Sequence, residues 1–131
     1  MKNKKVLLLS AFVLLGAQAY ADQPATVITT STQTTVQCPS TNFKSFLSTF
    51  INSTDVQKAF THLSTANGEV NFPVIPNAAD RKAEDMRVKV AELRGTRAKV
   101  ILDKPETDFK VVFYFQKKAC WQLVRIQDLS G

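Results

Sequence analysis

The sequence predicts an α+β domain in which two N-terminal helices pack on a curved antiparallel sheet of four or more strands. Three observations carry this prediction. Apolar residues recur at the helical period over residues 43–51, a second capped helix follows, and four strand-like runs joined by short turns fill residues 86–129. Each helix is apolar on one side only, so it needs the sheet in order to bury that side.

Residues 1–21 have the pattern of a secretory signal peptide. A basic start precedes an apolar run over residues 6–15, and Ala19-Tyr20-Ala21 forms a small-residue cleavage site. Cleavage after Ala21 predicts a mature bacterial protein that is periplasmic or secreted. The apolar run is too short to span a bilayer, so we expect no stable membrane anchor. An uncleaved anchor or a buried N-terminal helix is the alternative.

The net charge argues against one class of partner. The whole chain carries 17 basic and 11 acidic residues, but Lys2, Lys4 and Lys5 belong to the predicted signal. The mature chain keeps 14 basic residues and a net charge of +3. Such a charge is ordinary for a solvated protein surface, so we expect no nucleic-acid partner.

The remaining chain divides into a spacer and a domain. Residues 22–37 contain six threonines and no basic residue, which is typical of a flexible or extended spacer. The β-branched residues 26–30 could instead add an edge strand. The predicted organisation is a signal peptide (1–21), a Thr-rich spacer (22–37) and one α+β domain (38–131).

Cys38 and Cys120 are the two cysteines of the chain. In an oxidising compartment an even number of cysteines favours a disulfide, and only one intramolecular pairing exists. The Cys38–Cys120 bond would join the start of the first helix to the start of the last strand. Two buried free thiols or an intermolecular bond are the alternatives.

The first helix is predicted to begin after the polar cluster at residues 39–42. Its buried face is the set of apolar residues spaced three and four apart, namely Phe43, Phe46, Leu47, Phe50 and Ile51. The second helix is predicted to begin with a capping box formed by Thr54 and Gln57. The two prolines in residues 72–76 then exclude a central strand.

Apolar and polar residues alternate in the four runs between residues 86 and 129, as expected for strands with one buried face. The alternation breaks near Ala91-Glu92-Leu93, which predicts a β-bulge or a sharp bend. In the hairpin that follows, we expect Leu102 to pair with Phe109, because this register places the apolar residues of both strands on one face.

The order of these elements resembles the NTF2-like (cystatin-like cone) superfamily. Two helices precede a long, bent antiparallel meander, whose ending Phe113-Tyr114-Phe115 to CWQLVRIQDLS carries a late tryptophan. The resemblance spans Ser40 to Ser130 and implies a curved sheet that wraps the helices around a conical cavity. Members of this superfamily include enzymes, ligand binders, immunity proteins and dimerisation modules, so the fold alone selects no function.

The leading functional hypothesis is an exported, non-enzymatic binding domain. It would take a small apolar ligand in the cone or a protein on the sheet face. The residues expected to line the ligand site are Phe46, Phe50, Phe113 and Trp121. The same residues also fit an ordinary hydrophobic core, and this alternative stays open.

A basic patch is the second candidate site. Adjacent strands could bring together four basic residues, Arg87, Lys89, Arg97 and Lys99. Such a patch would suit an immunity protein or inhibitor that docks on a toxin or hydrolase. Alternatively, these residues form a solvated sheet face on which Glu92 and Asp103 pair some of the charges.

A third candidate is the apolar face predicted for Val112, Tyr114, Val124 and Ile126, opposite the face of Trp121 and Leu123. If no helix covers this face, it calls for a partner or a homodimer through the sheet.

A small cone enzyme is the remaining hypothesis, because enzymes of the resembled superfamily place an Asp/His or Asp/Tyr pair in the cone. The candidate groups are His62, the single histidine, and Asp55. The sequence shows no nucleophile elbow, no Gly-rich phosphate loop and no His/Cys spacing for a metal. We therefore expect neither a metal nor a cofactor.

Overall fold

A computed structural model describes residues 35–64 and 67–131. The chain divides into two units, Met1–Thr35 and Val36–Gly131, and the second contains every helix and strand described below. The predicted signal peptide, its cleavage site after Ala21 and most of the Thr-rich spacer lie outside the described residues. A search of the described residues finds no helix that is long and apolar enough to cross a membrane.

Helix α2 spans Phe43–Asn52, where the apolar stripe predicts it. Its N-cap is Asn42, whose side chain accepts a hydrogen bond from the backbone N–H of Ser45 at 3.0 Å. Such a cap satisfies one of the free N–H groups of the first helical turn. The buried residues of α2 are Phe43, Phe46, Leu47 and Phe50.

Helix α3 is short, Thr54–Ala59, and its predicted capping box is wrong. The cap is Ser53, whose hydroxyl accepts a hydrogen bond from the N–H of Val56 at 3.2 Å. Ser53 has the extended backbone that an N-cap requires, because the chain leaves α2 there. The helix therefore starts one residue earlier than predicted, and Gln57 turns inward and is fully buried.

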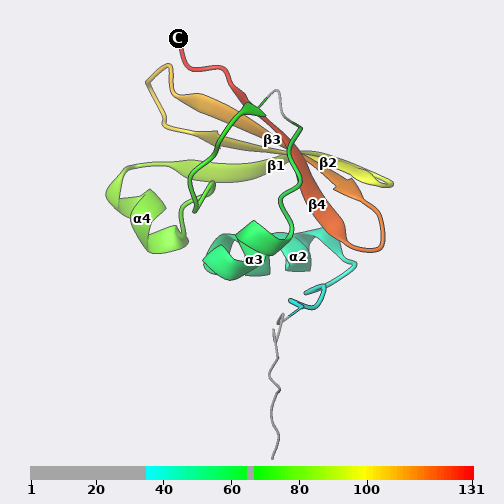
Figure 1. The fold of residues 1–131 in the computed structure, drawn as a ribbon. Helices are drawn as coiled ribbons and strands as arrows, with labels where there is room; N and C mark the ends of the chain where they lie inside the picture. Colours follow the sequence, from blue (N-terminus) through cyan, green and yellow to red (C-terminus); the bar gives the residue numbers. More distant parts are fainter. Residues whose placement is uncertain (1–34, 65–66) are drawn as a thin grey trace, which may run out of the picture. The chain divides into compact units, whose positions relative to one another are not determined.

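The sheet has four antiparallel strands in the order β1-β2-β3-β4. Figure 1 shows α2 and α3 on the same side of this sheet. The described domain is therefore α+β, as predicted, with one layer of helices on one face of a meander. The strands are β1 (Arg87–Arg94), β2 (Arg97–Asp103), β3 (Lys110–Lys117) and β4 (Trp121–Asp128). A third short helix, α4 (Ala78–Ala83), precedes β1.

The predicted irregularity in β1 is confirmed. Val90 pairs with Val100, but the next pair is Glu92 with Lys99, so Ala91 is an extra residue in β1. One extra residue changes which face the following side chains occupy. Lys89 and Glu92 consequently point to the same face of the sheet.

The predicted register between β2 and β3 is wrong by two residues. Leu102 pairs with Val111 instead of Phe109. The reason lies in the connecting turn, where the N–H of Thr107 bonds to Lys104 O at 3.2 Å. The N–H of Phe109 then bonds to the Thr107 hydroxyl, also at 3.2 Å, so the ladder begins only at Lys110. A shift of two residues preserves the faces, and the apolar residues still lie together.

The predicted face of Ile126 is also wrong. The register of β4 shifts at Tyr114/Phe115: Leu123 pairs with Phe115 and Arg125 with Tyr114. Val124 is therefore a second bulge residue, and Ile126 pairs with Phe113 on the face that the helices cover. Val124 remains on the opposite side, beside Tyr114.

We call the helix-covered side of the sheet the inner face and the opposite side the outer face. The inner face contributes half of the buried residues of the hydrophobic core, including Val100, Phe115 and Leu123. No helix of the described residues covers the outer face (Figure 1). The two faces therefore offer different surfaces to a partner.

Candidate functional site

The four residues predicted to line a ligand site lie on the inner face or on α2, and at most 2% of each is exposed: Phe46, Phe50, Phe113 and Trp121. The Phe46 and Phe50 rings meet Phe115 edge-on, at centroid distances of 6.0 and 5.3 Å respectively. Aromatic rings thus fill the part of the inner face that α2 covers. Of the four, Phe113 alone also contributes to the groove described below.

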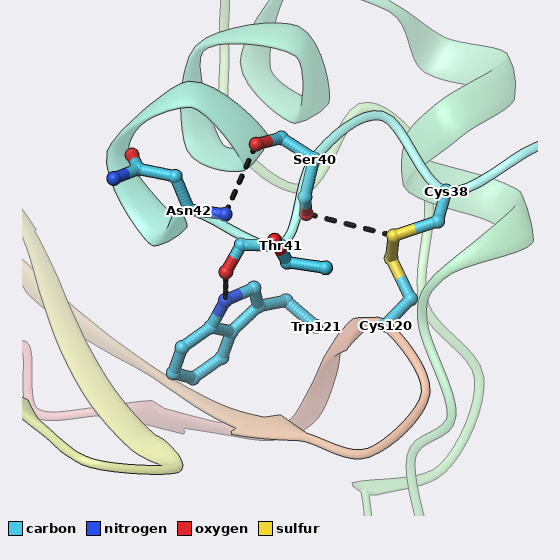
Figure 2. Close-up of a disulfide and its surroundings, with 6 residues drawn as sticks. All are labelled: Cys38, Ser40, Thr41, Asn42, Cys120 and Trp121. Atoms are coloured by element: carbon cyan, nitrogen blue, oxygen red, sulfur yellow. Dashed lines mark hydrogen bonds between the residues drawn. A yellow bond between two sulfur atoms is a disulfide. The ribbon is translucent and has the colours of Figure 1, made fainter.

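Trp121 is held at the start of β4 by polar and covalent contacts, which Figure 2 shows. Its indole N–H donates to Thr41 O at 2.9 Å. The adjacent Cys120 forms a disulfide with Cys38, with the Cα atoms 5.7 Å apart. The predicted Cys38–Cys120 pairing is therefore confirmed, and the segment before α2 is tied to the sheet.

An open groove of about 330 Å³ lies elsewhere on the inner face. We call it the apolar groove, because all but one of its lining residues are apolar. Its floor comes from the sheet and one of its walls from residues 70–76, which we call the strap. The lining residues are Val70, Asn71, Pro73, Val74, Pro76, Met86, Leu102, Phe109, Val111, Phe113 and Ile126.

Gln57 of α3 holds the strap in place. Its side-chain amide donates to Ile75 O at 3.0 Å, and its carbonyl oxygen accepts from the N–H groups of Val74 at 2.7 Å and Ile75 at 3.3 Å. Ile75 is itself fully buried. The strap pairs with no strand, so its backbone lacks the hydrogen bonds of a β-ladder. The bonds to Gln57 satisfy these backbone groups instead. They fix the wall of the apolar groove.

The four residues of the predicted basic patch lie on the outer face. Arg87 pairs with Asp103 across the β1–β2 ladder, and their side chains form an ion pair at 2.9 Å. The hydrogen bond from Arg87 lowers the pKa of Asp103 and raises the pKa of Arg87. Lys99 lies 3.7 Å from Glu92. Two of the expected pairings are therefore present.

Basic residues nevertheless dominate the outer face. The strand registers place seven on it, Arg87, Lys89, Arg94, Arg97, Lys99, Lys110 and Arg125, against two acidic ones, Glu92 and Asp103. This excess of positive charge extends beyond the four residues of the predicted patch. Arg125 is the addition that sequence alone does not indicate, because the bulge in β4 determines its face.

Tyr114 is at the centre of this face. The Arg125 guanidinium lies 4.7 Å from the centroid of its ring and the Lys99 ammonium 5.7 Å, both within range of a cation–π interaction. The Tyr114 hydroxyl donates to Gln127 at 2.9 Å. A shallow depression of about 330 Å³ surrounds the ring, with Arg97 among its lining residues.

The two candidate catalytic residues lie apart from the apolar groove. His62 is exposed, and its backbone N–H bonds to Leu123 O at 2.8 Å. Asp55 is exposed in the first turn of α3. Over residues 35–64 and 67–131, no group of three or more His, Cys, Asp or Glu residues is arranged to hold a metal ion.

Comparisons with known proteins add no relative. No family model, curated protein or solved structure matches this chain.

Proposed function

We propose that this protein is an exported, non-enzymatic binding domain that takes a small apolar ligand in the apolar groove. The observation that carries the proposal is the groove itself, an opening on the inner face with ten apolar lining residues and one polar residue, Asn71. Its volume of about 330 Å³ is at the lower end of the range for small-molecule sites. A single alkyl chain or a small aromatic molecule matches it in size and chemistry.

Two further features support this proposal. The groove wall is pre-formed, because Gln57 and the buried Ile75 hold the strap before any ligand arrives. A pre-formed site avoids the entropic cost of ordering a loop on binding. The disulfide supports the export part of the proposal, because such bonds persist in oxidising compartments.

The proposal is tested with N-phenyl-1-naphthylamine, an apolar dye that fluoresces when it leaves water. Val111→Glu places a carboxylate in the floor of the groove and should weaken dye binding about tenfold or more, because an unpaired charge is costly in an apolar site. Val124→Glu is the matched control, since Val124 is also half-buried but belongs to the outer face. Equal dye binding by the two variants would reject the groove as the site.

A second function is favoured by the outer face. Seven basic residues against two acidic ones would complement an acidic protein surface, as an immunity protein or inhibitor of a toxin or hydrolase would require. Poly-L-glutamate is a simple probe. Arg97→Glu/Arg125→Glu should weaken its binding, whereas Lys58→Glu, an exposed control on α3, should not.

Equal binding of poly-L-glutamate by the unmodified protein, the Arg97→Glu/Arg125→Glu variant and the Lys58→Glu control would reject the outer face as a binding site for an acidic partner. No described contact favours the third hypothesis, an enzyme using His62 or Asp55.

We also propose that the domain is an NTF2-like cone. The two helices on one face of a four-stranded meander, and the bulges in β1 and β4, support this proposal. In such a cone the apolar groove would be the open part of the conical cavity. A crystal structure of the protein would test it, since a flat sheet without a concave inner face would be incompatible with the superfamily.

A further inference from the structure

Strand β1 is an edge of the sheet with an unused side. Its one neighbour is β2, and the single isolated bridge among the described residues joins Thr61 to Leu123 at the other edge. The backbone groups on the free side of β1 therefore have no strand partner in the described chain. An edge of eight residues is long enough to pair with another strand.

The sequence of this edge, RVKVAELR, is complementary to itself in the antiparallel sense. If two copies of β1 pair about a two-fold axis between Val90 and Ala91, Lys89 of each copy lies opposite Glu92 of the other. In the same register Val88 lies opposite Leu93. A two-fold axis makes every such contact occur twice.

The bulge in β1 makes this register compatible with the two faces. In a regular strand, residues 88 and 93 would point to opposite faces, because they are an odd number of residues apart. With Ala91 as an extra residue, Val88 and Leu93 both lie on the inner face, while Lys89 and Glu92 both lie on the outer face. In the paired copies, apolar side chains would therefore lie opposite apolar ones, and acidic side chains opposite basic ones.

Leu93 provides a second observation that points to a partner. It is 47% exposed and is one of three large hydrophobic residues that are exposed in the described chain. A depression of about 460 Å³ lies between α4 and the start of β1. Its lining residues are three apolar ones, Ala78, Met86 and Val88, and four charged ones, Arg81, Lys82, Asp85 and Arg87. No residue of β2 lines it, so it opens on the free side of β1.

We propose that β1 is a homodimer interface, in which two copies pair antiparallel to form one continuous eight-stranded sheet. Leu93 of each copy enters the depression beside Val88 of the other, and two Lys89–Glu92 ion pairs fix the register. The unfavourable contact is Arg87 opposite Arg94, which also occurs twice, and Asp103 already pairs with Arg87 at 2.9 Å. This inference does not rest on the proposed ligand.

A charge-swap experiment tests the register. Sedimentation equilibrium of the purified protein should show a concentration-dependent dimer. Lys89→Glu and Glu92→Lys should each weaken dimerisation about tenfold, because each replaces two attractive cross-strand pairs by two repulsive ones. The double variant restores opposite charges and should recover the affinity of the unmodified protein. Leu93→Asp should be monomeric.

Lys118→Glu is the control for the change of charge, since Lys118 is exposed in the β3–β4 turn. It should dimerise as the unmodified protein does. Far-UV circular dichroism checks that each variant is folded.

A monomer at every attainable concentration would overturn the proposal, and the charges and bulge of β1 would then serve to protect the edge. A dimer in which the double variant binds no more tightly than the single variants would overturn it equally.

Discussion

Gln57 shows how one side chain positions the candidate site. It is fully buried on α3 and makes three hydrogen bonds to the backbone of Val74 and Ile75. A buried amide is stable only when its polar atoms are satisfied. Gln57 and the strap therefore depend on each other, and the wall of the apolar groove depends on both.

Replacing Gln57 tests this role. Gln57→Leu keeps the volume of the side chain but leaves buried backbone groups of the strap unpaired, so it should lower the free energy of unfolding by about 2–4 kcal/mol. Gln122→Leu on the outer face is the matched control and should change it by less than about 0.5 kcal/mol. Urea denaturation measures both. Equal losses would mean that the strap does not depend on Gln57.

The Arg87–Asp103 pair predicts a pH dependence with a definite sign. The hydrogen bond from Arg87 lowers the pKa of Asp103 below its ordinary value of 3.8. The stability that the pair contributes is therefore complete above about pH 4 and is lost as the pH falls through the lowered pKa. The contribution is small, because the Arg87 side chain is 62% exposed and solvent screens the pair.

Carbon-13 NMR of the Asp103 carboxyl group measures this effect. Arg87→Gln should raise the titration midpoint of Asp103 toward 3.8. Arg94→Gln, which alters a more distant arginine of the same strand, should leave it unchanged. An identical midpoint in the protein and in Arg87→Gln would show that the ion pair does not form in solution.

Single residues also show why part of the site could not be predicted. Ser53 and Thr54 both have side chains that can cap a helix, and in the structure Ser53 is the cap and Gln57 is fully buried. Sequence periodicity does not distinguish two adjacent caps. The connection from Gln57 to the strap, 17 and 18 residues away, has no sequence signal at all.

At the scale of elements, the two bulges determine which side chains lie on the inner face and which on the outer face of the sheet. The bulge in β1 interrupts an alternation of apolar and charged residues, so the sequence indicates it. The bulge residue in β4 is Val124, and its neighbours Leu123 and Ile126 are apolar as well. Because the pattern there is nearly continuous, the sequence could not indicate which of these residues faces the core.

Paired lysine substitutions test the β4 bulge. Ile126→Lys should lower the free energy of unfolding by about 2–4 kcal/mol, because it places a charge on the inner face. Val124→Lys should cost less than about 1 kcal/mol, since its side chain can reach solvent on the outer face. Thermal and urea denaturation both give this comparison. If Val124→Lys lowered the free energy of unfolding more than Ile126→Lys, then Val124 would lie on the inner face and β4 would have no bulge at this position.

Element lengths explain why the inner face holds both a core and a groove. Helix α2 has ten residues and β3 has eight, so they are about 15 and 27 Å long. A short helix covers only part of such strands, and the strap borders what remains. The sequence predicts the helix and the strands, but not which aromatic residues each part of the inner face receives.

At the scale of the whole molecule, the disulfide is the longest covalent constraint. It joins residues 82 positions apart and ties the segment before α2 to the start of β4. Closing a loop of this length should contribute about 4 kcal/mol in the chain-entropy model. Cysteine count and the predicted export signal were sufficient to predict this pairing, because only one intramolecular pairing exists.

Removing the bond tests its contribution. Cys38→Ser/Cys120→Ser should lower the free energy of unfolding by about 4 kcal/mol, and the unmodified protein should show no free thiol under denaturing conditions. A thiol assay with and without reductant checks the second expectation. Two reactive thiols in the unreduced, denatured protein would show that the bond is absent.

The central claim is that an apolar ligand binds in the groove beside the strap. It is tested most directly by titrating the nitrogen-15-labelled protein with N-phenyl-1-naphthylamine and recording amide chemical shifts. The largest changes should occur at Val74, Val111, Phe113 and Ile126, which line the groove. Changes centred on Tyr114 and Arg125 of the outer face, or no changes at saturating dye, would contradict the proposed function.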